Sequence, residues 1–390
     1  MVPTPAQYHH YIPRFILRTF ADNFSLITSN TEHIVPSTPG VFEPIVKQGG
    51  ADCTIELNDT ARAYGIYDMY RDIDADDEMK FQKLLSSLES ASATFIRKIW
   101  SGEDLSLTRA QLSDMKKFLC IMRLRLEGRR GQYYNIQFDL KTLFSIKKHM
   151  EHNNIKKVQD VWFDNLKWLI ETPVDRILVE YDKVVNIVPD HPFASSLQYQ
   201  GPIHVTELMD FGYMASYYVC IWQAEEGSEF ILSDNCFGAF ESDKGYSFHD
   251  FFIVSPRYAI VLVSRMYMLP NIDVLPLRKS WFSEKLHSNS ETVYAKGPLP
   301  KNVVLKDHYS PDDVLKYRRI VVPKQDVYKV NSILLDCRSK SLTYKSPVNM
   351  LKSLRFYDRV KSNKVLFTFE YDYTILKRKL FADLNRTHSS

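Results

Sequence analysis

Apolar residues recur at helical spacing through much of the first half of this chain, and no other feature constrains the fold as strongly. The clearest run has apolar side chains three and four positions apart, as one buried helix face requires: Phe81, Leu84, Leu85, Leu88, Phe95, Ile96 and Ile99. A second helix begins near Thr108, where Gln111 completes a capping box, and Pro173 divides the helical pattern that follows. We therefore predict a helical subregion over about 72–187.

The second half of the chain changes to short apolar runs of strand length. Residues 219–222 and 230–232 are separated by a polar turn and predict a hairpin. Residues 251–254 and 258–264 predict two more strands. Together these runs indicate a small, mainly antiparallel sheet within the subregion of about 200–300.

Helical character returns in the C-terminal region of about 301–390. Ser310 followed by Pro311 is typical of a helix start, and the apolar spacing predicts a further helix over about 325–340. A chain of 390 residues can bury one large core. We expect a single α+β domain over 1–390, with a mostly helical N-terminal half packed against the sheet.

Composition and motifs exclude several classes of protein. No apolar run approaches the roughly 20 residues that span a bilayer, and no signal sequence opens the chain, so we expect a cytoplasmic protein without membrane partners. Five cysteines without a CxxC pair support neither a disulfide framework nor a zinc site. The Walker A, GxGxxG, GxSxG and HExxH signatures are all missing, so we expect no cofactor and no metal.

Charge is distributed unevenly along the chain. Residues 301–390 hold 19 Lys and Arg against 9 Asp and Glu, which gives +10 and leaves −7 for residues 1–300 out of a total of +3. A basic region of this kind can attract a polyanion such as RNA. A solvated, lysine-rich surface explains the same composition.

The N-terminal segment 8–20 is unusually rich in functional side chains. Pro13 suits the first turn of a helix, and Arg14 and Arg18 lie four positions apart on one side of it. His9 and His10 are adjacent, so at most one of them can face a given site.

Three further groups of side chains are candidates, each with a plainer explanation. The carboxylates Asp74, Asp76, Asp77 and Glu78, with Glu89 beyond them, either cap a helix or bind a cation and act as a base. The arginines Arg123, Arg125, Arg129 and Arg130 either complement a helix dipole or clamp phosphate. Ser233, Asp234 and Asn235 end a strand, as turn residues or as a pocket lining.

These segments together resemble the DUF4238 family. The resemblance rests on the opening of residues 9–20, the pair Leu88-Glu89, Arg123 after a long apolar helix, and two later strand segments; the matching strings are HHYIPRFILRTF, FILSDN and FFIVSPR. Within the family the chain looks most similar to fungal members, which include arginine-containing cyclodipeptide synthases of secondary metabolism. The acidic motif of those enzymes is matched most nearly by Asp74, Asp76, Asp77 and Glu78, at a different spacing.

The resemblance implies a transferase that joins arginine from Arg-tRNA to the aminoacyl group of a second aminoacyl-tRNA and closes a diketopiperazine. It would use His9 or His10 as base or ester-positioning donor, with Asp76, Asp77 and Glu78, while Asp74 and Glu89 hold the guanidinium or amine. Arg14, Arg18 and Arg123 would contact the ester or phosphate, and Ser233, Asp234 and Asn235 would line the pocket. An aminoacyl ester is already activated, which agrees with the missing ATP motif. Two alternatives stay open: a metal-dependent nuclease, and a binding module whose His-Arg opening only packs the core.

Overall fold

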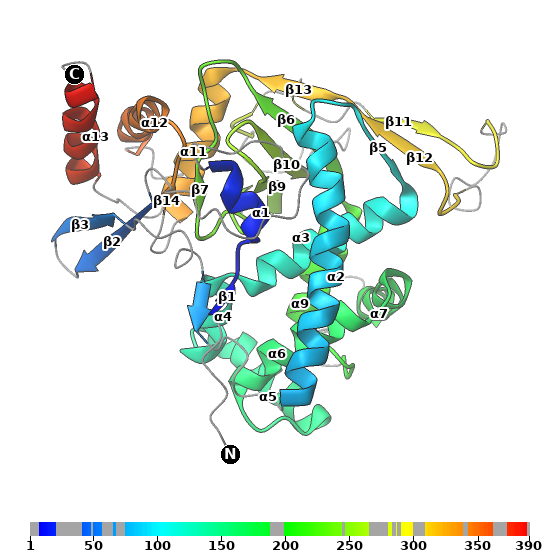
Figure 1. Cartoon of the computed structure of the whole chain (residues 1–390). Coiled ribbons are helices and arrows are strands. Elements are labelled where there is room, and N and C mark those ends of the chain that lie inside the picture. The colour runs from blue at the N-terminus through cyan, green and yellow to red at the C-terminus, as the bar shows by residue number, and fades with distance from the viewer. Residues whose placement is uncertain are drawn as a thin grey trace.

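The computed structural model describes the chain in segments separated by short gaps (Figure 1). The described residues are 8–20, 41–47, 50–56, 65–67, 75–187, 199–243, 246–264, 280–282, 286, 290–298, 309–337, 342–361 and 373–387. Within them, the side chains of residues 8–10, 41–47, 50–56, 65–67, 75–78, 187, 243, 246, 375, 379, 383, 386 and 387 lie outside the description.

Helices dominate the first half, as the apolar spacing predicted. The helices are α1 Arg14–Leu17, α2 Ala75–Trp100, α3 Arg109–Arg125, α4 Glu127–Tyr134, α5 Leu140–Asn153, α6 Val158–Glu171, α7 Val174–Ile187, α9 Val205–Ser216, α11 Lys324–Cys337, α12 Pro347–Val360 and α13 Thr374–Thr387, with a short 3-10 turn at Arg18–Phe20. Both predicted helix boundaries are confirmed: Thr108 and Gln111 form a capping box, and Pro173 lies between α6 and α7. Helix α3 packs against α2, α6 and α9, so its buried face forms the centre of the helical half.

The strands form small sheets that are mainly antiparallel, which confirms the α+β prediction. The strands are β1 Tyr8–His10, β2 Val41–Lys47, β3 Gly50–Glu56, β4 Gly65–Tyr67, β5 Leu105–Thr108, β6 Tyr218–Ala224, β7 Leu232–Ser233, β8 Phe240–Asp243, β9 Tyr246–Ile253, β10 Tyr258–Val263, β11 Ser290–Val293, β12 Val314–Tyr317, β13 Arg319–Val322 and β14 Leu342–Thr343. The largest sheet has the order β13-β6-β10-β9-β8, with a parallel pair only between β13 and β6.

The middle strands of the largest sheet are buried on both faces. Strand β10 is an unbroken apolar run, and all its residues after Tyr258 are buried. A strand with both faces covered loses the alternation of polar and apolar residues. The indole of Trp100, at the end of α2, donates a hydrogen bond to the Val254 carbonyl at 3.2 Å, which ties the helical half to this sheet.

A separate sheet, β11-β12-β5, reaches outward from the body (Figure 1). Its base is held by Asp313, which is fully buried. The Asp313 carboxylate accepts hydrogen bonds from the backbone N–H groups of Ala295 and Ser310 and from the guanidinium of Arg109. One carboxylate therefore joins three segments of the chain.

Two local predictions are wrong. Strand β6 does not form a hairpin with 230–232, because β6 pairs with β10 and β13 while β7 pairs with β14. The Ser310-Pro311 segment forms a turn into β12 instead of starting a helix, because Asp313 accepts the Ser310 N–H and turns the chain back. Helices α11 to α13 still make the C-terminal region largely helical.

Two further findings concern the cysteines and the apolar character of the helices. The described cysteines Cys120, Cys220, Cys236 and Cys337 are all free thiols. Among the described residues, no helix combines the length and apolar character needed to cross a membrane.

Candidate functional site

A break between α3 and α4 organises the candidate site. Leu126, at the break, has φ −55° and ψ 144°, an extended conformation that ends α3 at Arg125 and lets α4 begin at Glu127. The break leaves the Leu124 carbonyl without its helical partner, and the Trp162 indole donates to it at 2.9 Å. The buried Leu126 side chain anchors the turn, so the arginines before and after it point in different directions.

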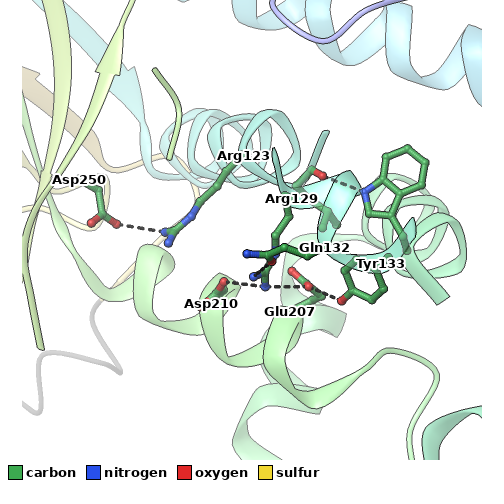
Figure 2. A network of polar contacts seen from close by, with 9 residues as sticks. Arg123, Arg129, Gln132, Tyr133, Glu207, Asp210 and Asp250 are labelled. Atoms are coloured by element: carbon green, nitrogen blue, oxygen red, sulfur yellow. Dashed lines mark hydrogen bonds and ion pairs between the residues drawn. The ribbon is translucent and has the colours of Figure 1, made fainter. Parts of the chain in front are cut away.

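Arg129 on α4 binds the first turns of α9 (Figure 2). Its Nη2 lies 2.8 Å from Glu207 Oε1 and 3.4 Å from Asp210 Oδ2, and its Nη1 donates to Gln132 Oε1 at 3.0 Å. The Tyr133 hydroxyl donates to the same Glu207 oxygen at 2.5 Å. Glu207 and Asp210 are three positions apart, so they occupy one face of α9 and meet the same guanidinium.

Arg123 on α3 faces the largest sheet. Its Nη1 lies 3.5 Å from Asp250 Oδ2 on β9, and its guanidinium carbon lies 5.7 Å from the Phe240 ring centroid on β8. Phe240 and Asp250 are directly opposite in the β8–β9 ladder. Directly opposed residues share a sheet face, which explains how both reach one arginine. The Ser247 hydroxyl donates to the other Asp250 oxygen at 2.5 Å.

Burial and charge act against each other at these groups. Burial lowers the pKa of Arg123, but Asp210 and Asp250 outweigh it and the net pKa is raised. Burial likewise opposes the charge of Arg129, and Glu207 and Asp210 raise its pKa above the ordinary value. Burial raises the pKa of the Asp250 carboxyl despite Arg123, and burial with Glu207 raises that of Tyr133 well above normal. Asp250 is therefore a stronger base than an exposed aspartate.

We call Arg123, Arg129, Glu207, Asp210 and Asp250 the mixed-charge site; its two cations and three anions sum to −1. The side chains of Arg123, Arg129 and Asp210 are 26%, 24% and 32% exposed, whereas Glu207 and Asp250 are 4% and 6% exposed. The site therefore has solvent-accessible side-chain surface on Arg123, Arg129 and Asp210. Such a site can bind a molecule that carries both an ammonium or guanidinium group and an anionic or ester oxygen.

The N-terminal segment 8–20 and the Ser-Asp-Asn turn both contact the chain at the α3–α4 break, next to this site. The Tyr11 hydroxyl, from the N-terminal segment, donates to Glu127 Oε2 at 3.4 Å. Asn235 lies against Gly128, where an added Cβ would stand 3.1 Å from Asn235 Oδ1. The same Asn235 donates its amide to the Cys337 carbonyl at the end of α11. The opening segment and the Ser-Asp-Asn turn thus meet the same short stretch of chain, 127–128.

Other candidate residues of the N-terminal segment are placed as follows. Arg14 and Arg18 are both exposed. Phe15 between them contacts Trp100, at the C-terminal end of α2, with ring centroids 6.2 Å apart. The backbones of His9 and His10 pair with Ile66 and Gly65 on β4.

The candidate carboxylates are not all gathered in one place. Residues Asp76, Asp77 and Glu78 lie in the first turn of α2, and Asp74 precedes it outside the described residues. At 1.5 Å per residue, the start of α2 is about 37 Å from Trp100, so the acidic start and the Phe15 contact lie at opposite helix ends. Glu89 pairs with the buried Arg125 at 2.7 Å.

The Ser-Asp-Asn group is a turn at the end of β7, as its turn interpretation predicted. Ser233 and Asp234 are buried, and the Ser233 hydroxyl accepts the Asn235 N–H at 3.3 Å. The phosphate-clamp alternative gains no support, because Arg123, Arg125 and Arg129 each pair with a carboxylate of the chain. Arg130, the fourth, lies 3.6 Å from the Tyr134 ring centroid.

A buried pair of histidines lies behind the start of α9. His149 on α5 and His204, which precedes α9, have ring centroids 5.6 Å apart. Burial lowers the pKa of His149 to about 4 and that of His204 to about 3. Asn153 Nδ2 lies 3.2 Å from His149 Nδ1, and it also donates to the carbonyls of His149 and Gly201 at 3.1 Å.

Sequence reasoning missed Tyr133, Glu207, Asp210 and Asp250. The spacing of Glu207 and Asp210 on an amphipathic segment was a usable signal, since residues three apart share a helix face. Asp250 carried no signal, because a lone carboxylate in an apolar strand acquires a partner only when β9 meets α3. In the described part of the chain, no group of three or more His, Cys, Asp or Glu is arranged to hold a metal ion.

Comparison with known proteins gives one match. A family model described as "Protein of unknown function (DUF4238)" matches residues 8–346. No curated protein and no solved structure matches the chain. The matched span includes the N-terminal segment, the α3–α4 break, the Ser-Asp-Asn turn and all five residues of the mixed-charge site.

Proposed function

Since the chain belongs to the DUF4238 family, whose function is unknown, we propose from its residues that it is an aminoacyl-tRNA-dependent cyclodipeptide synthase. In this proposal the enzyme joins arginine from Arg-tRNA to a second aminoacyl group and releases a cyclo-Arg-Xaa diketopiperazine. The observation that carries the proposal is the mixed-charge site, which is partly open to solvent and bordered by the motif-bearing segments at 127–128.

The reaction needs two rounds of the same chemistry. The α-amine of one aminoacyl group attacks the ester carbonyl of the other, a C–N bond forms, and the C–O bond to the ribose breaks. The amine loses one proton to a base, and the ribose oxygen takes up a proton as it leaves. A second, intramolecular attack closes the ring and releases the second tRNA. Both esters are already activated, so no nucleotide-binding loop is required, in agreement with the sequence.

The residues of the mixed-charge site have chemistry that suits these steps. Asp210 is its most exposed carboxylate, so we assign it the substrate ammonium or guanidinium group. Arg123, whose side chain is partly exposed, carries a guanidinium that can stabilise the negative charge developing on the ester oxygen. Asp250 is 6% exposed and pairs with Arg123, so we assign it the positioning of that guanidinium. Asp210, the carboxylate with solvent-accessible surface, is the candidate base for the α-amine.

Candidate residues outside this site keep supporting roles in the proposal. The exposed Arg14 and Arg18 are assigned to phosphates of the tRNA 3′ end. His9 or His10 is assigned the positioning of the ester, and Asp76 and Asp77 the second cationic group. Glu89, by contrast, neutralises the buried Arg125, so we assign it to the fold.

The direct test combines purified protein, Arg-tRNA and each other aminoacyl-tRNA in turn, with mass spectrometry of the products. A diketopiperazine that contains arginine is expected in at least one mixture. Cleavage of the tRNA that requires Mg²⁺ or Mn²⁺ and stops in chelator would support the nuclease alternative instead. Absence of any diketopiperazine with all the standard amino acids would overturn the proposal.

Substitutions then test the role proposed for each carboxylate. Asp210→Asn keeps the side-chain shape but removes the charge, and we expect it to abolish product while circular dichroism and unfolding stay unchanged. The control is Asp182→Asn on α7, which removes an exposed carboxylate on another helix and should retain full activity. Full activity of Asp76→Asn/Asp77→Asn would remove the α2 carboxylates from the mechanism.

A further inference from the structure

Helix α12 carries a row of basic side chains on its solvent face. Lys352, Arg355 and Arg359 are all exposed, and their spacing of three and four residues aligns them along one side of the helix. The opposite side is apolar and packs against α11, with Met350, Leu354 and Tyr357 buried. The row is therefore a separate surface and not part of the core.

The three cations are not neutralised within the described part of the chain. No ion pair joins Lys352, Arg355 or Arg359 to a described carboxylate. The acidic residue of α12, Asp358, instead forms a hydrogen-bonded ion pair with Lys377 on α13. Arg359 lies 5.4 Å from the Phe356 ring centroid, so its nearest described partner is an aromatic ring, and its charge faces solvent.

The neighbouring helix extends the basic character. On α13, Arg378 is exposed and the Phe381 side chain, three residues on, is 54% exposed. Helices α11, α12 and α13 lie side by side at one end of the molecule (Figure 1). The α12 cations and the exposed Phe381 ring on the neighbouring helix are groups that single-stranded or end-frayed RNA can bind. The cations contact phosphates, and the ring stacks on bases.

A short series of contacts connects helix α12, which carries the basic row, to the border of the candidate site. Helix α12 packs on α11, and the last residue of α11, Cys337, accepts the amide of Asn235. Asn235 in turn lies against Gly128 at the α3–α4 break. Packed helices are about 8–10 Å apart, so one helix diameter separates α12 from the element that touches the site border.

We propose that Lys352, Arg355 and Arg359 form the docking surface for the phosphate backbone of the tRNA acceptor stem, with its 3′ end directed to the mixed-charge site. The choice of tRNA as the RNA rests on the proposed function. The proposal that the row binds RNA does not rest on the proposed function, because it depends only on the charge and exposure of Lys352, Arg355 and Arg359.

The test measures equilibrium binding of uncharged tRNA over a range of salt concentrations. In Lys352→Gln/Arg355→Gln/Arg359→Gln, three phosphate contacts are lost. Each contact contributes about 0.7 to 0.9 to the slope of log K against log salt. We expect the magnitude of that slope to fall by about 2 and the affinity at low salt to fall by at least about tenfold.

The control is Lys83→Gln/Arg97→Gln/Lys98→Gln on α2, which removes three equally exposed charges elsewhere. It should leave the slope within about 1 of that of the unmodified chain. An unchanged slope in the α12 variant, or an equal decrease in the α2 control, overturns the proposal. Stronger binding of the unmodified chain to anionic phospholipid vesicles than to tRNA would also overturn it, in favour of a membrane surface.

Product formation separates this proposal from the proposed function. If a diketopiperazine forms, the α12 variant should raise the KM for aminoacyl-tRNA at least about tenfold with kcat unchanged, because the row lies outside the reacting groups. If no diketopiperazine forms but the salt slope falls as expected, the docking surface stands and the synthase activity fails.

Discussion

The side chain of Asn235 packs so closely against Gly128 that a Cβ at position 128 would stand only 3.1 Å from its Oδ1. Gly128 therefore lets the Ser-Asp-Asn turn approach the start of α4. This contact joins two segments more than a hundred residues apart at the border of the mixed-charge site.

Gly128→Ala is expected to destabilise the protein by about 1 kcal/mol, because Asn235, held by the Cys337 carbonyl, must shift by a few tenths of an ångström to admit the methyl group. Gly131→Ala, in the same helix, is the matched control. Its Cβ would lie 3.7 Å from the nearest atom, an ordinary contact, so alanine should stabilise the helix by roughly 0.5–1 kcal/mol. Urea unfolding measures both. Equal effects of the two substitutions would contradict the close approach of Asn235.

Arg129→Met should be one of the most destabilising substitutions in the chain. It leaves the buried Glu207 carboxylate with the Tyr133 hydroxyl as its remaining side-chain donor among the described residues, and an unpaired buried charge costs about 3–5 kcal/mol. Glu207→Gln in the same background removes that charge. The double variant should therefore recover part of the loss, which a double-mutant cycle of unfolding free energies would measure. Strict additivity would mean that the two groups do not interact.

Stability should fall as the pH drops below about 6.5, because of the two buried histidines. The folded pKa values are about 4 for His149 and about 3 for His204, below the ordinary value of 6.5. The unfolded chain therefore binds protons first, and the free energy of unfolding decreases between pH 6.5 and these values.

Each unit of pKa depression corresponds to about 1.4 kcal/mol at full protonation of the unfolded group. Denaturant titrations at several pH values between 7.5 and 5 measure the slope. His149→Leu should flatten it, whereas His152→Gln, at an exposed position on the same helix, should leave most of it in place. An unchanged slope in the His149 variant would assign the acid sensitivity to other groups.

Asp313→Asn should loosen the outward sheet β11-β12-β5 before the rest of the molecule. The amide cannot accept all the hydrogen bonds that the carboxylate accepts from Arg109, Ala295 and Ser310. Hydrogen exchange is expected to rise in β11 and β12 and to stay unchanged in β9 and β10. The neighbouring exposed Asp312→Asn serves as control and should not alter exchange in any strand.

Local sequence signals predicted the helix start at Thr108 and the break at Pro173, because the causes of both are local. The capping box of Thr108 and Gln111 satisfies backbone groups within three residues, and Pro173 ends a helix through its own ring. The strand errors have the opposite cause. Strand β6 was assigned a neighbour along the chain, but its parallel partner β13 begins nearly a hundred residues later. Strand pairing depends on such distant partners, which periodicity does not encode.

The sequence by itself determined the α+β class, the helix start at Thr108, the break at Pro173, and a family resemblance that the match over residues 8–346 confirms. Only the tertiary structure decided which charged residues meet. Arg123 and Arg129 were visible as helix-end cations, but Asp250, Glu207 and Asp210 become their partners through the break at Leu126 and the packing of α9 and β9. The physical reason is range: caps and turns act over a few residues, whereas a charge acquires its function from whatever the folded chain places within about 4 Å of it.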